Sequence, residues 1–368
     1  QPMRHCNPTQ KIWLGNGIFI IWSLLYPYAS ALIAQPITPS RNLWPAKAAK
    51  IEGQPLQTPQ ALWEKQKDVL KDAMKTVMGP LPSKPLAPPK FTLLEEVDAG
   101  SYIRRLIEYE TDPGTVTPAF LCVPKRALMK GAQLPAALCL HPTDDRVGHR
   151  VVLGLGGRPG REYAHELAER GWVALAPAYP LLAQYQPDLD QLGYLSGSMK
   201  AISDNRRGVD LLETLPFVQP EGFAAIGHSL GGHNAIFTAV WDERIKVVVS
   251  SCGFDRFVDY KGGDIRGWTS RRYMPRLLDH PIDALPFDFD QLIASLAPRS
   301  IFISAPVEDD NFRVESVREI VKAVQPVFKN LGKPAGLKAV YPLVGHDFPM
   351  EVRLEAYAFM EEALAGHR

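Results

Sequence analysis

One short segment of the chain places a serine where it could act as a nucleophile. The sequence Gly-His-Ser-Leu-Gly occupies positions 227–231, after a short apolar stretch and before a run compatible with a helix. A strand that turns sharply into a helix at a serine strains the backbone, and the residues two positions away on either side must be small. Gly227 and Gly231 meet that requirement. We therefore predict that Ser229 is a nucleophile and that the Leu230 N–H helps to hold an oxyanion.

A serine hydroxyl is a weak nucleophile without a base, so a histidine must lie nearby in space. Where the serine follows a strand in this way, the histidine usually comes after the last strand of the sheet. The apolar stretch 337–341 is the last strand that we expect, and His346 follows it. His346 is therefore the predicted base. His228 and His233 are weaker candidates, because the first should point away from the turn and the second lies one helical turn beyond the serine.

The carboxylate that orients the histidine is expected between the serine and the histidine, at the end of the penultimate strand. The predicted strand 301–303 leads into Glu308, Asp309 and Asp310. We favour Asp309 as the acid, with Asp310 as the first alternative and Glu308 as the second. Asp255, which follows an earlier predicted strand, is a more remote alternative.

A second oxyanion donor is expected from the loop after the predicted strand 136–140. That loop begins with His141, Pro142 and Thr143. Pro142 has no N–H to donate, so the predicted donor is the backbone N–H of Thr143, acting with that of Leu230. We expect His141 to brace this loop, and we count it among the residues that could border the substrate pocket.

The elements that must position these residues are predicted from the spacing of apolar residues. Eight short apolar stretches predict strands at 103–109, 119–123, 136–140, 173–176, 224–226, 247–250, 301–303 and 337–341. Amphipathic runs predict helices at 163–170, 199–215, 232–240, 316–331 and 351–364. Strands that alternate with helices form a mostly parallel sheet covered on both faces. The sequence thus predicts an α/β fold of eight strands, with the first strands antiparallel at one edge.

The composition of the chain fits a large globular domain with a short N-terminal addition. The chain has 368 residues, 46% of them hydrophobic, and a formal net charge of +1. This balance gives no electrostatic reason to expect a nucleic-acid partner. We expect residues 91–368 to form a catalytic domain and residues 35–90 an extension with one helix. That helix should start at Thr58-Pro59, because Thr suits an N-cap and Pro the first helical position.

The first 34 residues have the layout of a secretory signal peptide. Arg4 and Lys11 precede an apolar run over 12–34, and no acidic residue occurs before Glu52. Cleavage is expected after Ala31 or Ala34. A retained membrane anchor is the alternative, because the run is nearly long enough to span a bilayer. We predict a secreted or periplasmic protein with no membrane partner after cleavage.

Three of the four cysteines lie outside the predicted signal peptide: Cys122, Cys139 and Cys252. They lie in or just after predicted strands, and none has the paired spacing of a zinc site. We expect buried free thiols, with one disulfide as an open alternative, and no metal or cofactor.

A long segment between two predicted strands, residues 253–292, is expected to lie over the site like a lid. It contains seven aromatic residues, among them Trp268 and Tyr273. Insertions at this end of a sheet shape the substrate pocket. Trp268 and Tyr273 could stack on a sugar or an aromatic ring, although for any one of these aromatics a place in a small core under the loop is the favoured interpretation.

Several short sequences extend this picture to a family resemblance. They are 227–234 (Gly-His-Ser-Leu-Gly-Gly-His-Asn), 267–269 (Gly-Trp-Thr), 272–275 (Arg-Tyr-Met-Pro), 297–299 (Ala-Pro-Arg), 305–306 (Ala-Pro), 309–312 (Asp-Asp-Asn-Phe) and 345–349 (Gly-His-Asp-Phe-Pro). With them, the chain from about residue 63 resembles secreted bacterial α/β-hydrolases related to dienelactone hydrolases, acetylxylan esterases and prolyl-oligopeptidase catalytic domains. The resemblance implies the α/β-hydrolase fold, and its Asp-x-Asn-Phe pattern implies Asp309 as the acid.

The resemblance also limits the activity. Dienelactone hydrolases use a cysteine nucleophile, whereas this chain has Ser229, and oligopeptidases carry a β-propeller that the N-terminal region is too short to form. The main hypothesis is a serine carboxylic ester hydrolase that acts through an acyl-enzyme on a carbohydrate or small aryl ester. The alternatives are an aminopeptidase or amidase without a propeller, and a catalytically silent binding protein on the same fold.

Overall fold

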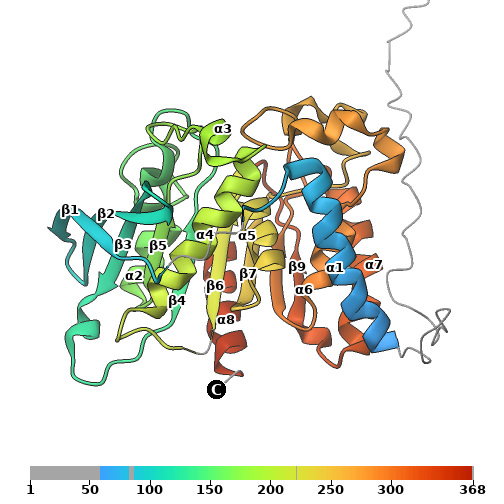
Figure 1. The fold of residues 1–368 in the computed structure, drawn as a ribbon. Coiled ribbons are helices and arrows are strands. Elements are labelled where there is room, and N and C mark those ends of the chain that lie inside the picture. The colour runs from blue at the N-terminus through green and yellow to red at the C-terminus, as the bar shows by residue number, and fades with distance from the viewer. Residues whose placement is uncertain (1–58, 83–86, 221, 367–368) are drawn as a thin grey trace, which may run out of the picture. The chain divides into compact units, whose positions relative to one another are not determined.

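The computed structural model describes residues 59–82, 87–220 and 222–366, and these form a layered α/β structure around one twisted sheet (Figure 1). The sheet has nine strands in the order β1-β2-β3-β5-β4-β6-β7-β8-β9. The strands are β1 (Phe91–Asp98), β2 (Tyr102–Asp112), β3 (Thr115–Pro124), β4 (Ala136–Leu140), β5 (Val173–Pro177), β6 (Phe223–His228), β7 (Ile245–Ser251), β8 (Ser300–Ser304) and β9 (Leu337–Val340). Strands β1, β2, β3 and β5 pair antiparallel, and β5, β4, β6, β7, β8 and β9 pair parallel.

The predicted sheet is confirmed in its architecture and corrected in its strand count, which is nine and not eight. The additional strand is β1, which forms the edge beside β2. Most of its side chains are exposed. An exposed edge strand lacks the buried apolar run by which the other strands were predicted, so its sequence resembles that of a loop.

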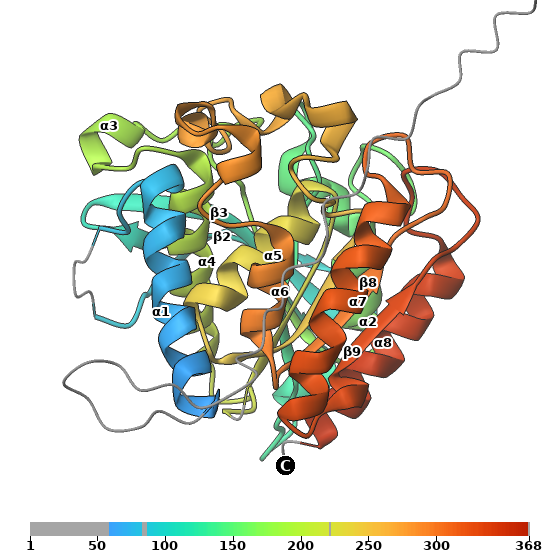
Figure 2. The ribbon, with the colours of Figure 1, turned by 90° about the vertical axis from the view of Figure 1, so that its right-hand side faces the viewer.

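Helices cover both faces of the sheet (Figures 1 and 2). They are α1 (Pro59–Met78), α2 (Tyr163–Glu169), α3 (Leu189–Leu192), α4 (Gly197–Glu213), α5 (Leu230–Trp241), α6 (Phe289–Leu296), α7 (Val314–Asn330) and α8 (Met350–Ala365). The core on one face takes its buried residues from α1, α4, α5, α6 and α7. The core on the other face takes them from α2 and α8. Along β7, Val248 faces the first core, whereas Val247 and Val249 face the second, as the two-residue period of a strand requires.

The segment between β7 and β8 contains short 3₁₀ turns, which lie above the carboxyl ends of the parallel strands, and α6, which packs beside the sheet against α5 and α7 (Figure 1). Phe254, Phe257, Phe287 and Phe289 are at most 2% exposed, and they form a core within this insertion. Helix α1 contacts α6 and the 3₁₀ turn Pro275–Asp279. The insertion is therefore a packed part of the main body.

Three expectations concern other parts of the chain. The predicted signal peptide, residues 1–34, lies outside the described residues. Among the described helices, none is both long and apolar enough to cross a bilayer. Cys122, Cys139 and Cys252 are free and buried, as the first of the two alternatives predicted.

Candidate active site

Ser229 lies at the sharp turn between β6 and α5, with backbone angles φ 55° and ψ −120°. A Cβ added to Gly227 would lie 2.2 Å from the carbonyl of Gly231, and one added to Gly231 would lie 1.9 Å from the carbonyl oxygen of Leu140. These separations are far below van der Waals contact. The two glycines are thus required by the close approach of the backbones, and the strained serine is held at the tip of the turn.

His346, in the loop between β9 and α8, connects Ser229 to Asp309. Its Nε2 lies 3.0 Å from the Ser229 Oγ, and its Nδ1 lies 2.9 and 3.0 Å from the two carboxylate oxygens of Asp309. A carboxylate can only accept, so Nδ1 carries the proton and donates it to Asp309. Nε2 is then left with a lone pair directed at the serine hydroxyl. This is the arrangement that general-base activation of a serine requires.

Asp309 is held in its charged form by His346 and by two backbone donors of its own loop. One carboxylate oxygen accepts from the N–H groups of Asn311, at 2.8 Å, and Phe312, at 3.1 Å. Burial favours the neutral acid, but the hydrogen bond and charge of His346 together with the two backbone donors outweigh it, and the pKa of Asp309 lies below its usual value. Its side chain is only 2% exposed, whereas that of His346 is 20% exposed.

The alternative acids lie elsewhere. Asp310 and Glu308 are exposed. The backbone carbonyl of Asp310, and not its carboxylate, accepts a hydrogen bond from the Lys261 ammonium. Asp255 is buried and accepts from the Arg313 N–H at 3.0 Å, at the start of α7. Burial raises the pKa of Asp255 well above its usual value. Asp255 thus supports the end of the acid-bearing loop and does not contact His346 in any of the hydrogen bonds among the described residues.

The two predicted oxyanion donors, Leu230 and Thr143, have backbone N–H groups that no hydrogen bond among the described residues uses. Leu230 is the first residue of α5, so its N–H has no partner within the helix. Thr143 lies in the loop after β4, and none of the hydrogen bonds of the described residues uses its N–H. The Thr143 hydroxyl lies 2.9 Å from that of Tyr273, which connects this loop to the insertion. The Arg272 guanidinium makes a second connection to Asp145 at 2.6 Å.

His141 braces the same loop. Its Nε2 accepts from the N–H of Tyr179 at 3.0 Å, so Nδ1 carries a proton and donates to the carbonyl of Pro142 at 2.8 Å. Burial lowers the pKa of His141 to about 4, which keeps the ring neutral. Both ring nitrogens are engaged within the protein, so neither is directed at a substrate.

The two aromatic candidates for the substrate pocket differ in their surroundings. Trp268 is 3% exposed, and its ring packs against Phe257, Phe289 and Phe312. This places it inside the insertion core, with no ring face open to a sugar. Tyr273 is partly exposed, and its ring lies near those of Tyr179 and His233. Of the two rings, only that of Tyr273 borders the surface beside Thr143.

One residue near the site was missed by the sequence analysis. Arg161 is 2% exposed, and its guanidinium donates to the Asp347 carboxylate at 2.6 Å and to the His346 carbonyl at 3.3 Å. It therefore fixes the backbone that carries the base. The only sequence signal is an arginine after the glycine-rich stretch 154–160, and no spacing rule connects that stretch with a histidine 185 positions later.

Comparisons with known proteins agree with the fold. No known protein-family profile matches the chain. The protein named "Putative hydrolase YtaP" from Bacillus subtilis (strain 168) is 29% identical over 258 residues, which cover 67% of this chain and 83% of that one. A glucuronoyl esterase from Solibacter usitatus superposes with a TM-score of 0.67 at 16% identity, covering 87% of this chain and 97% of that chain. Acetyl xylan esterase 1 from Thermoanaerobacterium sp. JW/SL YS485 superposes with a TM-score of 0.54 at 16% identity, covering 82% of this chain and 94% of that chain.

This chain has the α/β-hydrolase fold. The order of its strands and its similarity to these solved structures both show it. At 14–18% identity, the solved structures establish that fold alone. One fold can host many activities, so the activity of this chain depends on the residues of its own site.

Proposed function

We propose that this protein is a serine hydrolase that cleaves carboxylic esters through an acyl-enzyme. The observation that carries the proposal is the unbroken series of hydrogen bonds from the Ser229 hydroxyl through His346 to Asp309. Each residue comes from a different loop at the carboxyl ends of the parallel strands. The similarity of the chain to a named hydrolase and to solved esterase structures supports the same class of reaction.

The proposed reaction has two halves. In the first, Ser229 Oγ attacks the ester carbonyl carbon while His346 Nε2 takes the serine proton. The oxyanion is held by the N–H groups of Leu230 and Thr143, each contributing about 3 kcal/mol in the transition state. The intermediate then breaks its bond to the alcohol, which leaves with the proton from His346, and the acyl group stays on the serine.

In the second half, His346 removes a proton from water as the water attacks the acyl carbon. The bond between the acyl carbon and Ser229 Oγ then breaks, the serine oxygen takes the proton back from His346, and the carboxylic acid is released. Asp309 keeps the imidazole in the orientation and tautomer that both halves need, and it stabilises the imidazolium that forms in each.

We propose esters of carbohydrates as the substrate class. The solved structures that the fold resembles include a glucuronoyl esterase and an acetyl xylan esterase. On this chain, the partly exposed Tyr273 lies beside the proposed oxyanion loop, and we propose that it contacts the sugar ring. We also propose that residues 1–34 are a signal peptide and that the protein acts outside the cytoplasm, which the N-terminal sequence of the exported protein tests.

Kinetic comparison of the wild type with Ser229→Ala tests the proposal. The wild type should hydrolyse p-nitrophenyl acetate, acetylated xylan or a methyl ester of glucuronic acid, and Ser229→Ala should reduce each rate to background. Aminoacyl p-nitroanilides provide the amidase comparison. Turnover of the anilides without turnover of any ester would replace the proposed function by an amidase. An intact fold with no turnover at all would indicate a binding protein.

A further inference from the structure

Cys252 lies beside Asp309 and His346 of the proposed triad, although the proposed mechanism makes no use of it. The residue follows β7 and is 2% exposed. Its backbone has a positive φ of 47°, which is uncommon for a residue other than glycine. Its Sγ lies 3.3 Å from the carbonyl oxygen of Asp347, the residue after the base. The local backbone thus directs a thiol toward the loop that carries His346.

The thiol joins two other possible metal ligands. One ligand atom from each of Cys252, Asp309 and His346 lies within 4.8 Å of the other two. Tetrahedral zinc binds sulfur at about 2.3 Å and nitrogen or oxygen at about 2.0–2.2 Å, so its ligands lie roughly 3.3–3.8 Å apart. Movements of well under 2 Å therefore convert the present arrangement into a three-ligand site. A thiolate, an imidazole and a carboxylate are a ligand set that zinc favours.

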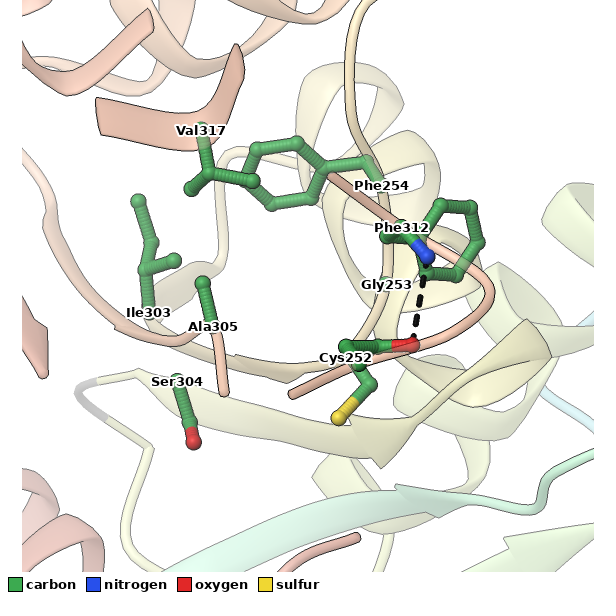
Figure 3. Close-up of a pocket in the computed structure, with 9 residues that line it drawn as sticks. Cys252, Gly253, Phe254, Ile303, Ser304, Ala305, Phe312 and Val317 are labelled. Carbon is green, nitrogen blue, oxygen red and sulfur yellow. Dashed lines mark hydrogen bonds between the residues drawn. The ribbon is translucent and has the colours of Figure 1, made fainter. Parts of the chain in front are cut away.

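The surroundings of Cys252 leave room for such a movement. A cavity of about 10 Å³ lies beside it, bordered by Phe254, Ile303, Phe312 and Val317 among others (Figure 3). Figure 3 shows the sulfur pointing away from the rings of Phe254 and Phe312. The Cys252 side chain thus borders a small unfilled space, and its sulfur contacts the carbonyl of Asp347 at 3.3 Å.

We propose that Cys252, Asp309 and His346 form a binding site for a borderline-soft divalent cation, with Zn²⁺ as the representative, and that binding inactivates the enzyme. Cys252 is a free, buried thiol in the metal-free protein. The metal takes the thiolate, and one proton is released to solvent. It also binds His346 Nδ1, because that nitrogen faces Asp309, and the Nδ1 proton moves to Nε2.

The tautomer change explains the inactivation, and this part of the proposal rests on the proposed function. In the metal-free protein, Nε2 has the lone pair that accepts the Ser229 proton. With Nδ1 bound to the metal, Nε2 carries a hydrogen and cannot accept. Asp309 coordinates the metal instead of orienting the imidazole. The metal therefore removes the base without occupying the place of the substrate.

The binding test uses Co²⁺, which replaces Zn²⁺ and gives a thiolate-to-cobalt charge-transfer absorption when a cysteine is a ligand. The protein is the full chain with Cys6→Ser, which removes the cysteine outside the described residues. One Co²⁺ per chain should bind with this absorption, and Cys252→Ser should abolish it. Cys139→Ser is the matched control, because Cys139 is equally buried but lies within β4, and it should retain the absorption. Absorption that survives Cys252→Ser would overturn the site.

The inhibition test measures hydrolysis of p-nitrophenyl acetate against Zn²⁺ concentration, with each variant normalised to its own metal-free rate. Cys252→Ser should raise the Zn²⁺ concentration for half-inhibition at least tenfold, and Cys139→Ser should leave it unchanged. Equal inhibition of both variants would contradict the proposal. The Co²⁺ absorption is also measured in Ser229→Ala, which needs no activity. A protein that binds Co²⁺ through Cys252 but hydrolyses no ester would refute the proposed function and leave the metal site standing.

Discussion

The guanidinium of Arg161 donates to the Asp347 carboxylate at 2.6 Å, directly beside the proposed base. The same guanidinium donates to the carbonyl of His346 at 3.3 Å. Arg161 lies in the loop before α2, 185 positions before the histidine that it supports. The position of His346 relative to Ser229 therefore depends on a buried cation that touches neither the serine nor the reacting atoms.

Replacing Arg161 should lower turnover more than it lowers substrate binding. Arg161→Met removes both hydrogen bonds, and a base displaced by about 1 Å costs about 100-fold in rate. We expect kcat to fall 10- to 100-fold with KM changed less than threefold, measured at a temperature where thermal melting shows the variant folded. Arg158→Met, in the same loop but exposed, is the control and should keep the wild-type rate. Equal losses in both variants would contradict the role of Arg161.

Substitutions at Thr143 should separate its backbone from its side chain. If the N–H is the oxyanion donor, Thr143→Ala keeps that donor and loses only the hydroxyl contact with Tyr273. We expect it to retain at least a third of kcat. Thr143→Pro removes the N–H and should lower kcat by about 100-fold or more. Steady-state kinetics on p-nitrophenyl acetate decide the matter, and similar rates for the two variants would assign the donor to another residue.

The glycine at the end of the serine turn should be intolerant of any side chain. A Cβ at Gly231 would meet the carbonyl oxygen of Leu140 at 1.9 Å, so Gly231→Ala must shift α5 or β4. We expect a loss of about 3 kcal/mol or more in the free energy of unfolding, measured by urea denaturation. Gly366→Ala, where the nearest atom would lie 3.7 Å away, should change that free energy by less than about 0.5 kcal/mol. Equal stability of the two variants would mean that the turn is not sterically closed.

The depressed pKa of Asp309 predicts a contribution to stability that depends on pH. The folded protein binds a proton at this carboxylate less readily than the unfolded chain does, because of the hydrogen bonds from His346, Asn311 and Phe312. The stabilisation is therefore fully present above the unfolded pKa, about 4, and is lost as the pH falls through the lower, folded value. Urea denaturation between pH 3 and 6 should show a decrease at the acid end that Asp309→Asn makes shallower. An identical pH dependence in Asp309→Asn would refute this linkage.

The sequence was informative where a short segment determines its own geometry. The spacing of Gly227 and Gly231 predicts the turn at Ser229. The structure places His346 and Asp309 next to that turn, as expected, and their catalytic roles stay predictions. Asp309 was favoured as the acid and a resemblance supported it, but Glu308, Asp309 and Asp310 are adjacent carboxylates that the sequence alone does not separate. Only the fold shows that two of them are exposed.

The features that the sequence did not reveal depend on contacts between distant segments. Strand β1 owes its existence to pairing with β2 and not to a buried apolar pattern. Trp268 was a candidate for stacking on a sugar, but its packing against Phe257 and Phe289 of the same insertion buries it. Arg161 and Cys252 contact the His346 loop only in the folded chain, and neither residue type nor spacing predicts such a contact.

The most direct test of Ser229 as the nucleophile is covalent labelling with a fluorophosphonate, followed by mass spectrometric mapping of the modified peptide. We expect one label per chain, located on Ser229. Labelling should be lost in Ser229→Ala and slowed at least 100-fold in His346→Ala, because the reagent reports a serine activated by a base. Labelling of a different residue, or an unchanged rate in either variant, would contradict the assignment of Ser229 as the nucleophile.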